Sequence, residues 1–597
     1  MHTHTLVCLF CLSVTFAAHP NLVRAAEKFN VILIVCDDLN DYVEGFGGHH
    51  QTRTPSIARL SRSGVSFTQA HCNIPICGPS RASLFTGIYP HNSGCYGFER
   101  WDGYEVLENS RTLMDQFRAN GYHTLGTGKL MHHLNRKEWV EYGNLADYGP
   151  FAFDGTERVA HPSVPTPFRE IGPIDGSFGP LVSLNNRTFA NGTSYTWQTG
   201  NWKKMRTLRV DSQQDREMTA DELNGKWAVE RLHELASQPS GKPFFMGVGF
   251  IRPHTPLIVP ERFFKQFPLD SITLPVILPG DVEDTHARSI RGNPASKEPN
   301  SERTADMGSR LFTDLVDSYD SQDEALKRFI QAYLASVASV DELIGRILDA
   351  VDDSSLKDNT VIVVTSDHGW GMGEKDYLYK NSLWQESTRV PLIVRAPGIA
   401  KAGGETDHPV SLIDLYPTLV DVCSLAGETK KNDKGHPLDG QSLKPFLENP
   451  RTEAWSGPDA VLTALYRWAK VYDPGDQSYA LRTKNWRYIR YRNGREELYH
   501  CTSDPHEWNN LANDPGHASR LNSFRERLKA RLPEPGVVPP QSTLRQKPET
   551  ASKGDAEAWK DKYFARHPDA DANKDGMLSW PELKVYRANV GDKKKRS

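Results

Sequence analysis

The sequence predicts an α/β protein with a large, mostly parallel sheet flanked by helices, followed by a smaller antiparallel subdomain and a helical tail. Two features support this prediction. Short runs of β-branched and other apolar residues end in polar or glycine-containing turns, and helical patterns separate these runs. Strands that are apolar throughout are typical of a sheet covered on both faces. Strands that alternate with helices indicate a mostly parallel order.

The first predicted strand of the sheet is residues 31–36 (VILIVC). The clearest helical pattern spans residues 325–351, where apolar side chains recur every three or four positions. The remaining predicted strands of the main sheet are residues 123–126, 244–250, 360–365 and 392–395. After about residue 450, short strands at 479–482, 486–491 and 497–499 predict the antiparallel subdomain.

Charged residues directly follow the ends of several predicted strands. In open α/β sheets the carboxyl ends of the strands form the edge where ligands bind, so we expect these side chains to meet in one cleft. Carboxylates with one imidazole suit Ca²⁺ or Mg²⁺, although helix capping or surface acids would also explain each pair. The residues concerned are Asp37, Asp38, Lys129, His254, Asp367 and His368.

The segment ICGPSRASLFTG is the most informative part of the sequence. It offers the Cys77 thiol, a turn set by Pro79, the Ser80 hydroxyl and the Arg81 guanidinium, which can bind an oxyanion through two nitrogens. We expect a helix to begin near Ser80, with its free N–H groups favouring an anion. Taken alone, the segment is better explained by a buried structural cysteine beside a capping Ser80-Arg81 pair.

These motifs together resemble the type I sulfatases of the alkaline phosphatase superfamily. Residues 77–81 resemble their C-x-P-S-R signature, in which a maturation enzyme oxidises the cysteine to formylglycine. The similarity extends from residue 30 to about 513. The Lys-x-x-His spacing, the Pro-His after an apolar strand and the Asp-His-Gly-Trp most resemble iduronate-2-sulfatase. The matching segments are residues 128–132, 252–254, 367–370 with Lys380, and 497–511.

The resemblance implies a role for each residue of the expected cleft. One Ca²⁺ would be held by Asp37, Asp38, Asp367, His368 and the modified Cys77. Arg81 would favour the alkoxide of the hydrated aldehyde, and His254 would protonate the leaving alcohol. Lys129, His132 and Lys380 would hold the sulfate oxygens, with His133 as an alternative to His132. A solvated lysine or a core histidine is the competing interpretation for Lys129, Lys380 and His254. Many sulfatases have Asn at the position of His368.

The chemistry implied by the resemblance is hydrolysis of a sulfate ester. One hydroxyl of the hydrated formylglycine attacks sulfur and displaces the alcohol, and the second hydroxyl then expels sulfate. The implied substrate is a sulfated saccharide, such as a uronate 2-sulfate in a glycosaminoglycan-like chain, with residues 149–221 shaping the pocket. Two alternatives stay open: a phosphonate or phosphate monoester hydrolase of the same superfamily, and a non-catalytic secreted carbohydrate-binding protein.

A second calcium motif lies in the tail. Residues 571–582 fit an EF-hand loop, with oxygen ligands at the required positions and Gly576 at the sixth. An Asp/Asn-rich turn is the simpler alternative. Because a partner hand is lacking, we expect a structural site or docking module rather than a sensor. The predicted ligands are Asp571, Asn573, Asp575, Met577, Ser579 and Glu582.

The N-terminus and the composition indicate the compartment and exclude one class of partner. The short apolar run at residues 6–18 predicts a cleaved signal peptide, export, and no membrane span in the mature chain. With 71 Lys+Arg against 75 Asp+Glu there is no basic surplus for nucleic acid. Sparse cysteines exclude a disulfide scaffold, leaving Cys72 and Cys95 as a candidate pair.

The predicted domains are a signal peptide (1–25), a sulfatase-like catalytic domain (26–450), a C-terminal α+β subdomain (451–532), a linker (533–554) and an EF-hand-like tail (555–597).

Overall fold

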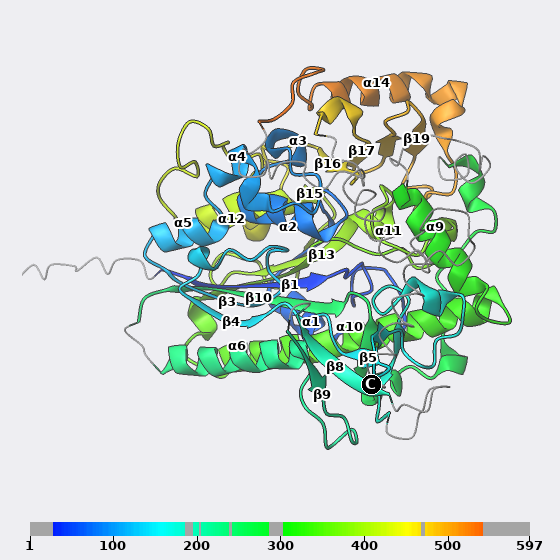
Figure 1. The fold of residues 1–597 in the computed structure, drawn as a ribbon. Helices are drawn as coiled ribbons and strands as arrows, with labels where there is room; N and C mark the ends of the chain where they lie inside the picture. The colour runs from blue at the N-terminus through cyan, green and yellow to red at the C-terminus, as the bar shows by residue number, and fades with distance from the viewer. Residues whose placement is uncertain are drawn as a thin grey trace, which may run out of the picture.

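A nine-stranded sheet forms the centre of the molecule (Figure 1). The computed structural model describes residues 28–184, 195–201, 204–237, 241–285, 303–466 and 472–540. Eight strands follow the order β14-β2-β13-β12-β1-β10-β3-β4, and β15 pairs with β2. Of these nine, β13 alone runs antiparallel to its neighbours, so the predicted, mostly parallel sheet is confirmed. The strands are β1 (Asn30–Asp37), β2 (Val65–His71), β3 (His123–Gly128), β4 (Glu141–Leu145), β10 (Phe244–Pro253), β12 (Thr360–Ser366), β13 (Arg389–Arg395), β14 (Gly404–Thr406) and β15 (Val410–Ser411).

Helices cover both faces of the sheet, which explains why its strands are apolar throughout. On the central strand β1, Ile32 and Ile34 belong to one hydrophobic core, and Val31 and Leu33 belong to the other. Figure 1 shows α6 and α10 beneath the sheet and α2, α5 and α12 above it. The helices are α1 (Pro55–Ser63), α2 (Cys77–Thr86), α3 (Pro90–Ser93), α4 (Glu105–Glu108), α5 (Leu113–Ala119), α6 (Ala220–Ala236), α7 (Glu261–Phe264), α9 (Arg303–Val316), α10 (Gln322–Asp352), α11 (Gln385–Thr388), α12 (Leu415–Val422), α13 (Lys444–Glu448) and α14 (Ala518–Lys529).

The long helix α10 supports the carboxyl end of β1. Ser321 caps its first turn by accepting from the backbone N–H of Glu324, and one face of the helix packs into the core, as its periodicity predicted. The Tyr333 hydroxyl donates to the Asp38 carbonyl (2.7 Å) and accepts from the Asn40 N–H (3.0 Å). The turn after β1 is therefore held from beneath by a buried side chain of α10.

The region between β4 and α6 contributes strands to two small sheets beside the main one, and β11 completes one of them. Strand β7 (Phe178–Leu181) pairs in parallel with β11 (Leu257–Pro260). A four-stranded antiparallel sheet has the order β6-β5-β8-β9, formed by β5 (Phe151–Phe153), β6 (Arg158–Val159), β8 (Thr196–Asn201) and β9 (Lys204–Leu208).

A separate antiparallel sheet near the C-terminus confirms the predicted subdomain. Its strands are β16 (Ala460–Ala464), β17 (Tyr479–Thr483), β18 (Arg487–Arg490) and β19 (Glu496–Tyr499). Helix α14 covers one face, where Phe524 stacks on Tyr488 with the ring centroids 5.6 Å apart. The sequence pattern missed β16, which lies just before residues outside the described ranges.

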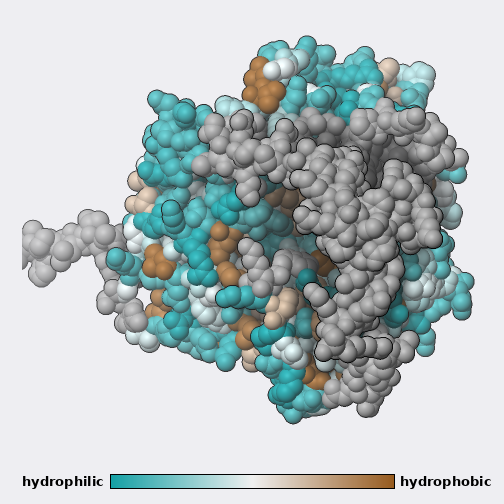
Figure 2. Space-filling model, in the orientation of Figure 1, coloured by the Kyte–Doolittle hydropathy of each residue, from teal (hydrophilic) through white to brown (hydrophobic). Residues whose placement is uncertain are grey.

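Several sequence predictions lie outside the described residues or are corrected by the structure. The signal peptide and the EF-hand loop with its six ligands are outside the described ranges and stay predictions. The candidate pair of Cys72 and Cys95 is wrong, because all six described cysteines are free and buried. Within the described ranges, no helix combines the length and the apolar character needed to cross a bilayer. Figure 2 shows that the visible described surface is mainly hydrophilic, with apolar residues in small patches.

A buried ion pair joins the C-terminal sheet to the segment that precedes α11 in the main part of the molecule. Arg487 on β18 contacts Glu507, and both side chains are only 1% exposed. Arg487 Nη1 also donates to the Leu383 carbonyl (3.1 Å), and Glu507 Oε2 accepts from the Gln385 N–H (3.3 Å). The pair therefore fixes the segment at residues 383–388, which follows Lys380, against the subdomain.

We predict that Arg487→Met lowers the free energy of unfolding by about 3–5 kcal/mol, because it leaves the Glu507 carboxylate buried without its partner. The matched control is Arg525→Met, which breaks a contact with Glu496 in which the arginine is 47% exposed. That change is expected to cost at most about 1 kcal/mol. Urea-induced unfolding of both variants measures the difference, and equal losses would contradict this account.

Candidate active site

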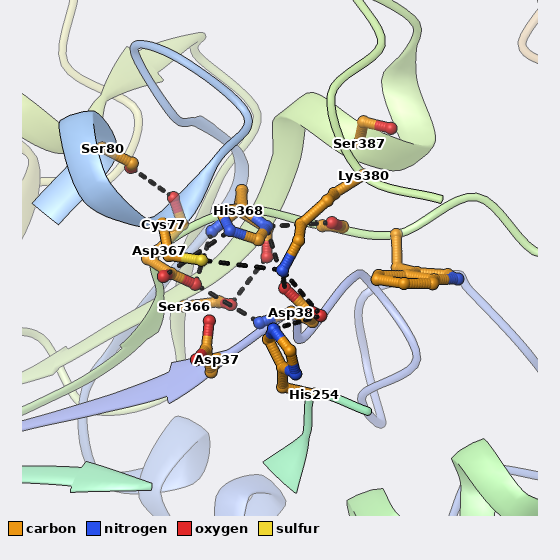
Figure 3. A network of polar contacts seen from close by, with 12 residues as sticks. Asp37, Asp38, Cys77, Ser80, His254, Ser366, Asp367, His368, Lys380 and Ser387 are labelled. Carbon is orange, nitrogen blue, oxygen red and sulfur yellow. Dashed lines mark hydrogen bonds and ion pairs between the residues drawn. The ribbon is translucent and has the colours of Figure 1, made fainter. Parts of the chain in front are cut away.

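Cys77 is the first residue of α2, and its side chain lies among the ends of β1, β10 and β12 (Figure 3). The helix thus begins three residues before the predicted start near Ser80. Pro79 suggested a turn, but a proline in the first helical turn loses no hydrogen bond, because the first N–H groups have no partner within the helix. The Ser80 hydroxyl donates to the Asp367 carbonyl (2.6 Å) and ties α2 to the end of β12.

Arg81 is completely buried and links α2 to three strand ends. Its Nε donates to Asp367 Oδ2 (2.7 Å), and its Nη2 lies 3.7 Å from Asp37 Oδ1. Its Nη1 donates to the carbonyls of Lys129 and Leu130. Arg81 is therefore occupied by protein groups rather than presented at the open cleft.

Lys129 is placed by a close crossing of β3 and β10. Gly128 has φ +76°, and a Cβ there would lie 1.9 Å from the Gly249 carbonyl oxygen, so only glycine fits. This crossing lets the Lys129 N–H donate to that same carbonyl (3.0 Å). The Lys129 ammonium contacts the Asp37 carboxylate and lies 4.9 Å from the centre of the Tyr148 ring. The pKa of Asp37 is lowered because Lys129 and other cations outweigh its burial.

Three positively charged or titratable side chains surround the Asp38 carboxylate. Its φ of +64° is a left-handed conformation that Asp tolerates better than most residues. Lys380 Nζ lies 3.0 Å from Asp38 Oδ1, and His368 Nδ1 lies 3.3 Å from the same oxygen. His254 Nε2 lies 3.7 Å from Asp38 Oδ2.

The Cys77 thiol lies in a strongly cationic environment. Burial alone would raise its pKa, but Lys129 and Lys380 outweigh burial, and hydrogen bonds from His132 and His254 act in the same direction. The pKa of Cys77 is therefore held well below the usual value for a thiol. Lys380 Nζ lies 3.6 Å from the sulfur. His132, the first of the two candidate histidines, forms a hydrogen bond with Cys77.

The carboxylates and the imidazole fit a metal ion. Ligand atoms of Asp37, Cys77, Asp367 and His368 lie within 4.8 Å of one another, as do those of Asp37, Asp38 and His254. Asp37 Oδ1 and His368 Nε2 are buried without a hydrogen-bond partner, which is costly unless another group satisfies them.

The charge of the cluster also favours a bound metal ion. Burial would lower the pKa of His368, but Asp367 and Asp38 raise it to about 9, so the cluster attracts positive charge. Burial raises the pKa of Asp367 to about 6, although Arg81 opposes this shift. A group of hard oxygen ligands with a net preference for positive charge is what a divalent cation such as Ca²⁺ requires.

The catalytic candidates other than Arg81 line a cleft of about 640 Å³, and Arg81 and the predicted metal ligands Asp37, Asp38, Asp367 and His368 lie behind them. Four wall residues fall within residues 149–221, which the sequence analysis expected to shape the pocket without singling out any of them: Phe151, Ile174, Asp175 and Gly200. The sequence analysis missed Phe98, Ala146, Tyr148 and Tyr379, because no motif marks them. The described residues that line the cleft are Cys77, Phe98, Lys129, His132, His133, Ala146, Tyr148, Phe151, Ile174, Asp175, Gly200, His254, Tyr379 and Lys380.

Comparison with known proteins identifies the family. The sulfatase family matches residues 29–425, and the C-terminal region of N-sulphoglucosamine sulphohydrolase matches residues 373–533. A sulfatase of Formosa agariphila is 33% identical over 516 residues, which cover 86% of this chain and 87% of the relative. Iduronate 2-sulfatase of Mus musculus is 26% identical over 587 residues, covering 86% of this chain and 96% of the relative.

Solved structures share the fold at low identity. Phosphonate monoester hydrolase from Silicibacter pomeroyi has a TM-score of 0.60 and 21% identity, covering 84% of this chain and 95% of its own. A protein solved in complex with its substrate D-glucosamine-2-N,6-O-disulfate has a TM-score of 0.57 and 20% identity, covering 84% of this chain and 97% of its own. The chain thus has the alkaline phosphatase/sulfatase-like fold.

This chain belongs to the sulfatase family and is a sulfuric ester hydrolase. The family match confirms the resemblance drawn from the sequence motifs. It does not single out iduronate-2-sulfatase, because relatives named arylsulfatase, arylsulfatase K and choline-sulfatase match with similar identity.

Asn381 provides a test of how Lys380 is held. Asn381 is buried with φ +65°, its Nδ2 donates to the Tyr466 carbonyl (3.2 Å), and its Oδ1 accepts from the Tyr466 N–H (3.2 Å). We predict that Asn381→Ala and Asn381→Gly both lower kcat for an aryl sulfate by about tenfold or more, because Lys380 loses its fixed position. Asn381→Gly should be the more stable of the two, since glycine tolerates positive φ.

The control for this prediction is Ser424→Ala, at an exposed position that also has positive φ (+49°) but lies away from the cleft. It should leave kcat unchanged. Steady-state kinetics of the three variants report whether Lys380 keeps its position. Thermal unfolding reports the backbone strain of a non-glycine residue at positive φ. A normal kcat in both Asn381 variants would contradict the proposal that the contacts of Asn381 with Tyr466 fix the position of Lys380.

Proposed function

We propose that the protein is an exported, Ca²⁺-dependent sulfatase that hydrolyses sulfate esters of saccharides through a formylglycine made from Cys77. One observation carries this proposal: Cys77 begins α2 within a single buried cluster that contains Lys380, Lys129 and the carboxylates at the strand ends. The apolar run at residues 6–18 supports export. The maturation enzyme that oxidises Cys77 is the predicted partner.

The metal site would use groups that the fold already holds together. Asp37, Asp38, Asp367 and His368 would hold Ca²⁺, with the modified Cys77 facing it. When bound, the ion supplies positive charge that stabilises a deprotonated hydroxyl of the hydrated aldehyde. The unsatisfied Asp37 Oδ1 and His368 Nε2 support this ligand set.

The cations at the cleft floor bind the sulfate and balance its charge. Lys129 and Lys380 both line the cleft, and His132 lines it beside Cys77. Fixed cations placed where negative charge develops lower the barrier without rearranging during the reaction. Arg81 positions α2 and contacts the carboxylates that surround the reacting group.

His254 is suited to donate a proton to the leaving alcohol. Its Nδ1 contacts the Thr255 carbonyl, which only accepts hydrogen bonds, so Nδ1 carries a hydrogen. Its Nε2, which lies 3.7 Å from Asp38 Oδ2, is then the atom that exchanges a proton with the substrate.

The proposed nucleophile is tested by peptide mass spectrometry on protein matured with a formylglycine-generating enzyme. The peptide that contains residue 77 is expected to carry the aldehyde in active protein. Cys77→Ala should lower kcat by at least about a thousandfold while leaving the fold intact. Full activity with an unmodified Cys77 thiol would overturn this mechanism.

We predict that Ca²⁺ raises the melting temperature through the main-domain cluster. The test uses a Glu582→Gln background, which removes the main ligand of the predicted tail loop. At a hundredfold excess over its dissociation constant, Ca²⁺ should add about 2.7 kcal/mol to stability. Asp37→Asn should abolish this gain, whereas Asp341→Asn, at a buried acid that caps α1, should keep it. An unchanged gain in Asp37→Asn would contradict the ligand set.

A phosphonate or phosphate monoester hydrolase is the second candidate, because the phosphonate monoester hydrolase noted above shares the fold. Matched aryl sulfate, phosphate and phosphonate esters assayed with the same matured protein decide between them. The expected order places the sulfate ester first in kcat/KM. A higher kcat/KM for the phosphonate ester would favour the second candidate.

A further inference from the structure

The wall of the cleft carries a carboxylate that the catalytic proposal does not use. Asp175 lies in the segment before β7 and lines the cleft beside Ile174. Among the described residues that line the cleft, Asp175 is the only acidic one, and none is an arginine. The carboxylates of Asp37, Asp38 and Asp367 lie behind the floor, where they are paired with cations.

A hydrogen bond places Asp175 on the side of the leaving alcohol. The Thr255 hydroxyl donates to Asp175 Oδ1 (2.7 Å), and Thr255 directly follows His254, the proposed proton donor. A group beside the proton donor faces the alcohol part of the ester rather than the sulfate. A carboxylate next to the sulfate itself would oppose binding of that anion.

A second observation relates Asp175 to Tyr379, another residue of the cleft lining. Burial raises the pKa of Tyr379 well above its usual value, and the negative charge of Asp175 adds to this shift. Tyr379 lines the cleft and directly precedes Lys380. Asp175 therefore lies in the cleft lining near both Thr255, which follows His254, and Tyr379, which precedes Lys380.

Thr255 leaves most of the hydrogen-bonding capacity of this carboxylate available. Each carboxylate oxygen has two acceptor positions, and a carboxylate cannot donate a hydrogen bond. A sugar hydroxyl or a protonated amine is the matching partner. A sugar carboxylate brought to the same place would meet a like charge, which at about 4 Å costs about 1–4 kcal/mol, or roughly fivefold to nearly a thousandfold in affinity.

We infer that Asp175 is a specificity residue that selects an uncharged or amino-bearing sugar as the alcohol part of the substrate and rejects a uronate. This inference rests on the proposed sulfatase activity and narrows its substrate class. It departs from the uronate 2-sulfate that the resemblance to iduronate-2-sulfatase suggested.

A purely structural role for Asp175 predicts something different. If the carboxylate only anchored the Thr255 hydroxyl, Asn would serve as well, because its side-chain oxygen accepts the same hydrogen bond. Asp175→Asn would then affect all sugar sulfates equally. If the role is purely structural, Asp175→Asn leaves the ratio of kcat/KM between neutral and carboxylated substrates unchanged. If Asp175 selects the substrate, this ratio changes.

The test uses matured full-length protein with verified formylglycine and matched pairs of methyl glycoside sulfates. Each galactoside sulfate is compared with the galacturonoside sulfated at the same carbon, so the two differ only at carbon 6. Glucose 6-sulfate and glucosamine 6-sulfate, which differ only at carbon 2, separate neutral from amino-bearing sugars. We expect kcat/KM to be at least about tenfold higher for the uncharged member of each cleaved pair.

Asp175→Asn should reduce this preference at least about fivefold by raising kcat/KM for the galacturonoside. Thr255→Val, which removes the hydroxyl that holds Asp175 but keeps the backbone carbonyl, should shift the ratio in the same direction. The control Asp270→Asn, at an exposed acid away from the cleft, should leave the ratio unchanged. If Asp175→Asn fails to fold, Thr255→Val alone decides.

The outcomes separate the two proposals. Cleavage of 4-nitrophenyl sulfate together with a preference for uronate sulfates, or with no cleavage of any sugar sulfate, overturns the role of Asp175 and leaves the sulfatase proposal standing. A preference that is unchanged in the Asp175→Asn and Thr255→Val variants also overturns it. Failure to cleave any sulfate ester, with formylglycine verified, overturns the proposed function and the inference with it.

Discussion

The buried Arg81 guanidinium is the interaction on which the geometry of the site depends. It joins α2 to the ends of β1 and β12 through Asp37 and Asp367, and to the residues after β3 through their carbonyls. A charge with no solvent exposure is tolerated only when protein groups satisfy it, so these segments must come together for the fold to form. Cys77 lies four residues before Arg81, on the same face of α2, and is therefore fixed with it.

The balance of charge around Cys77 explains why the cluster is suited to an anion and a cation at once. Lys129 pairs with Asp37 and Lys380 pairs with Asp38, so the two lysines neutralise the acids. A divalent cation held by those acids would take over this neutralisation. The lysines could then direct their charge to a sulfate in the cleft, where both of them are lining residues.

The sequence predicted the floor of this site well and its walls poorly, for physical reasons. Residues after apolar strands must meet at one edge of a parallel sheet, so Asp37, Lys129 and Asp367 were predictable from strand positions alone. The start of α2 was missed because Pro79 signals a turn as readily as a first helical turn. Asp175 lies in a segment without periodicity, and the contact between Asn381 and Tyr466 joins residues 85 positions apart. No local pattern encodes either of them.

This division between floor and walls bears on which substrate the protein acts on. A floor of buried acids, cations and a helix N-terminus suits any tetrahedral oxyanion, which is consistent with a phosphonate monoester hydrolase sharing the fold. Selection among sulfate esters must then come from residues that surround the organic part of the ester. The cleft walls include irregular segments, with Phe98, Tyr148 and Asp175 among their residues. Irregular segments tolerate substitution more easily than the strand ends, so one catalytic floor can serve different sulfate esters.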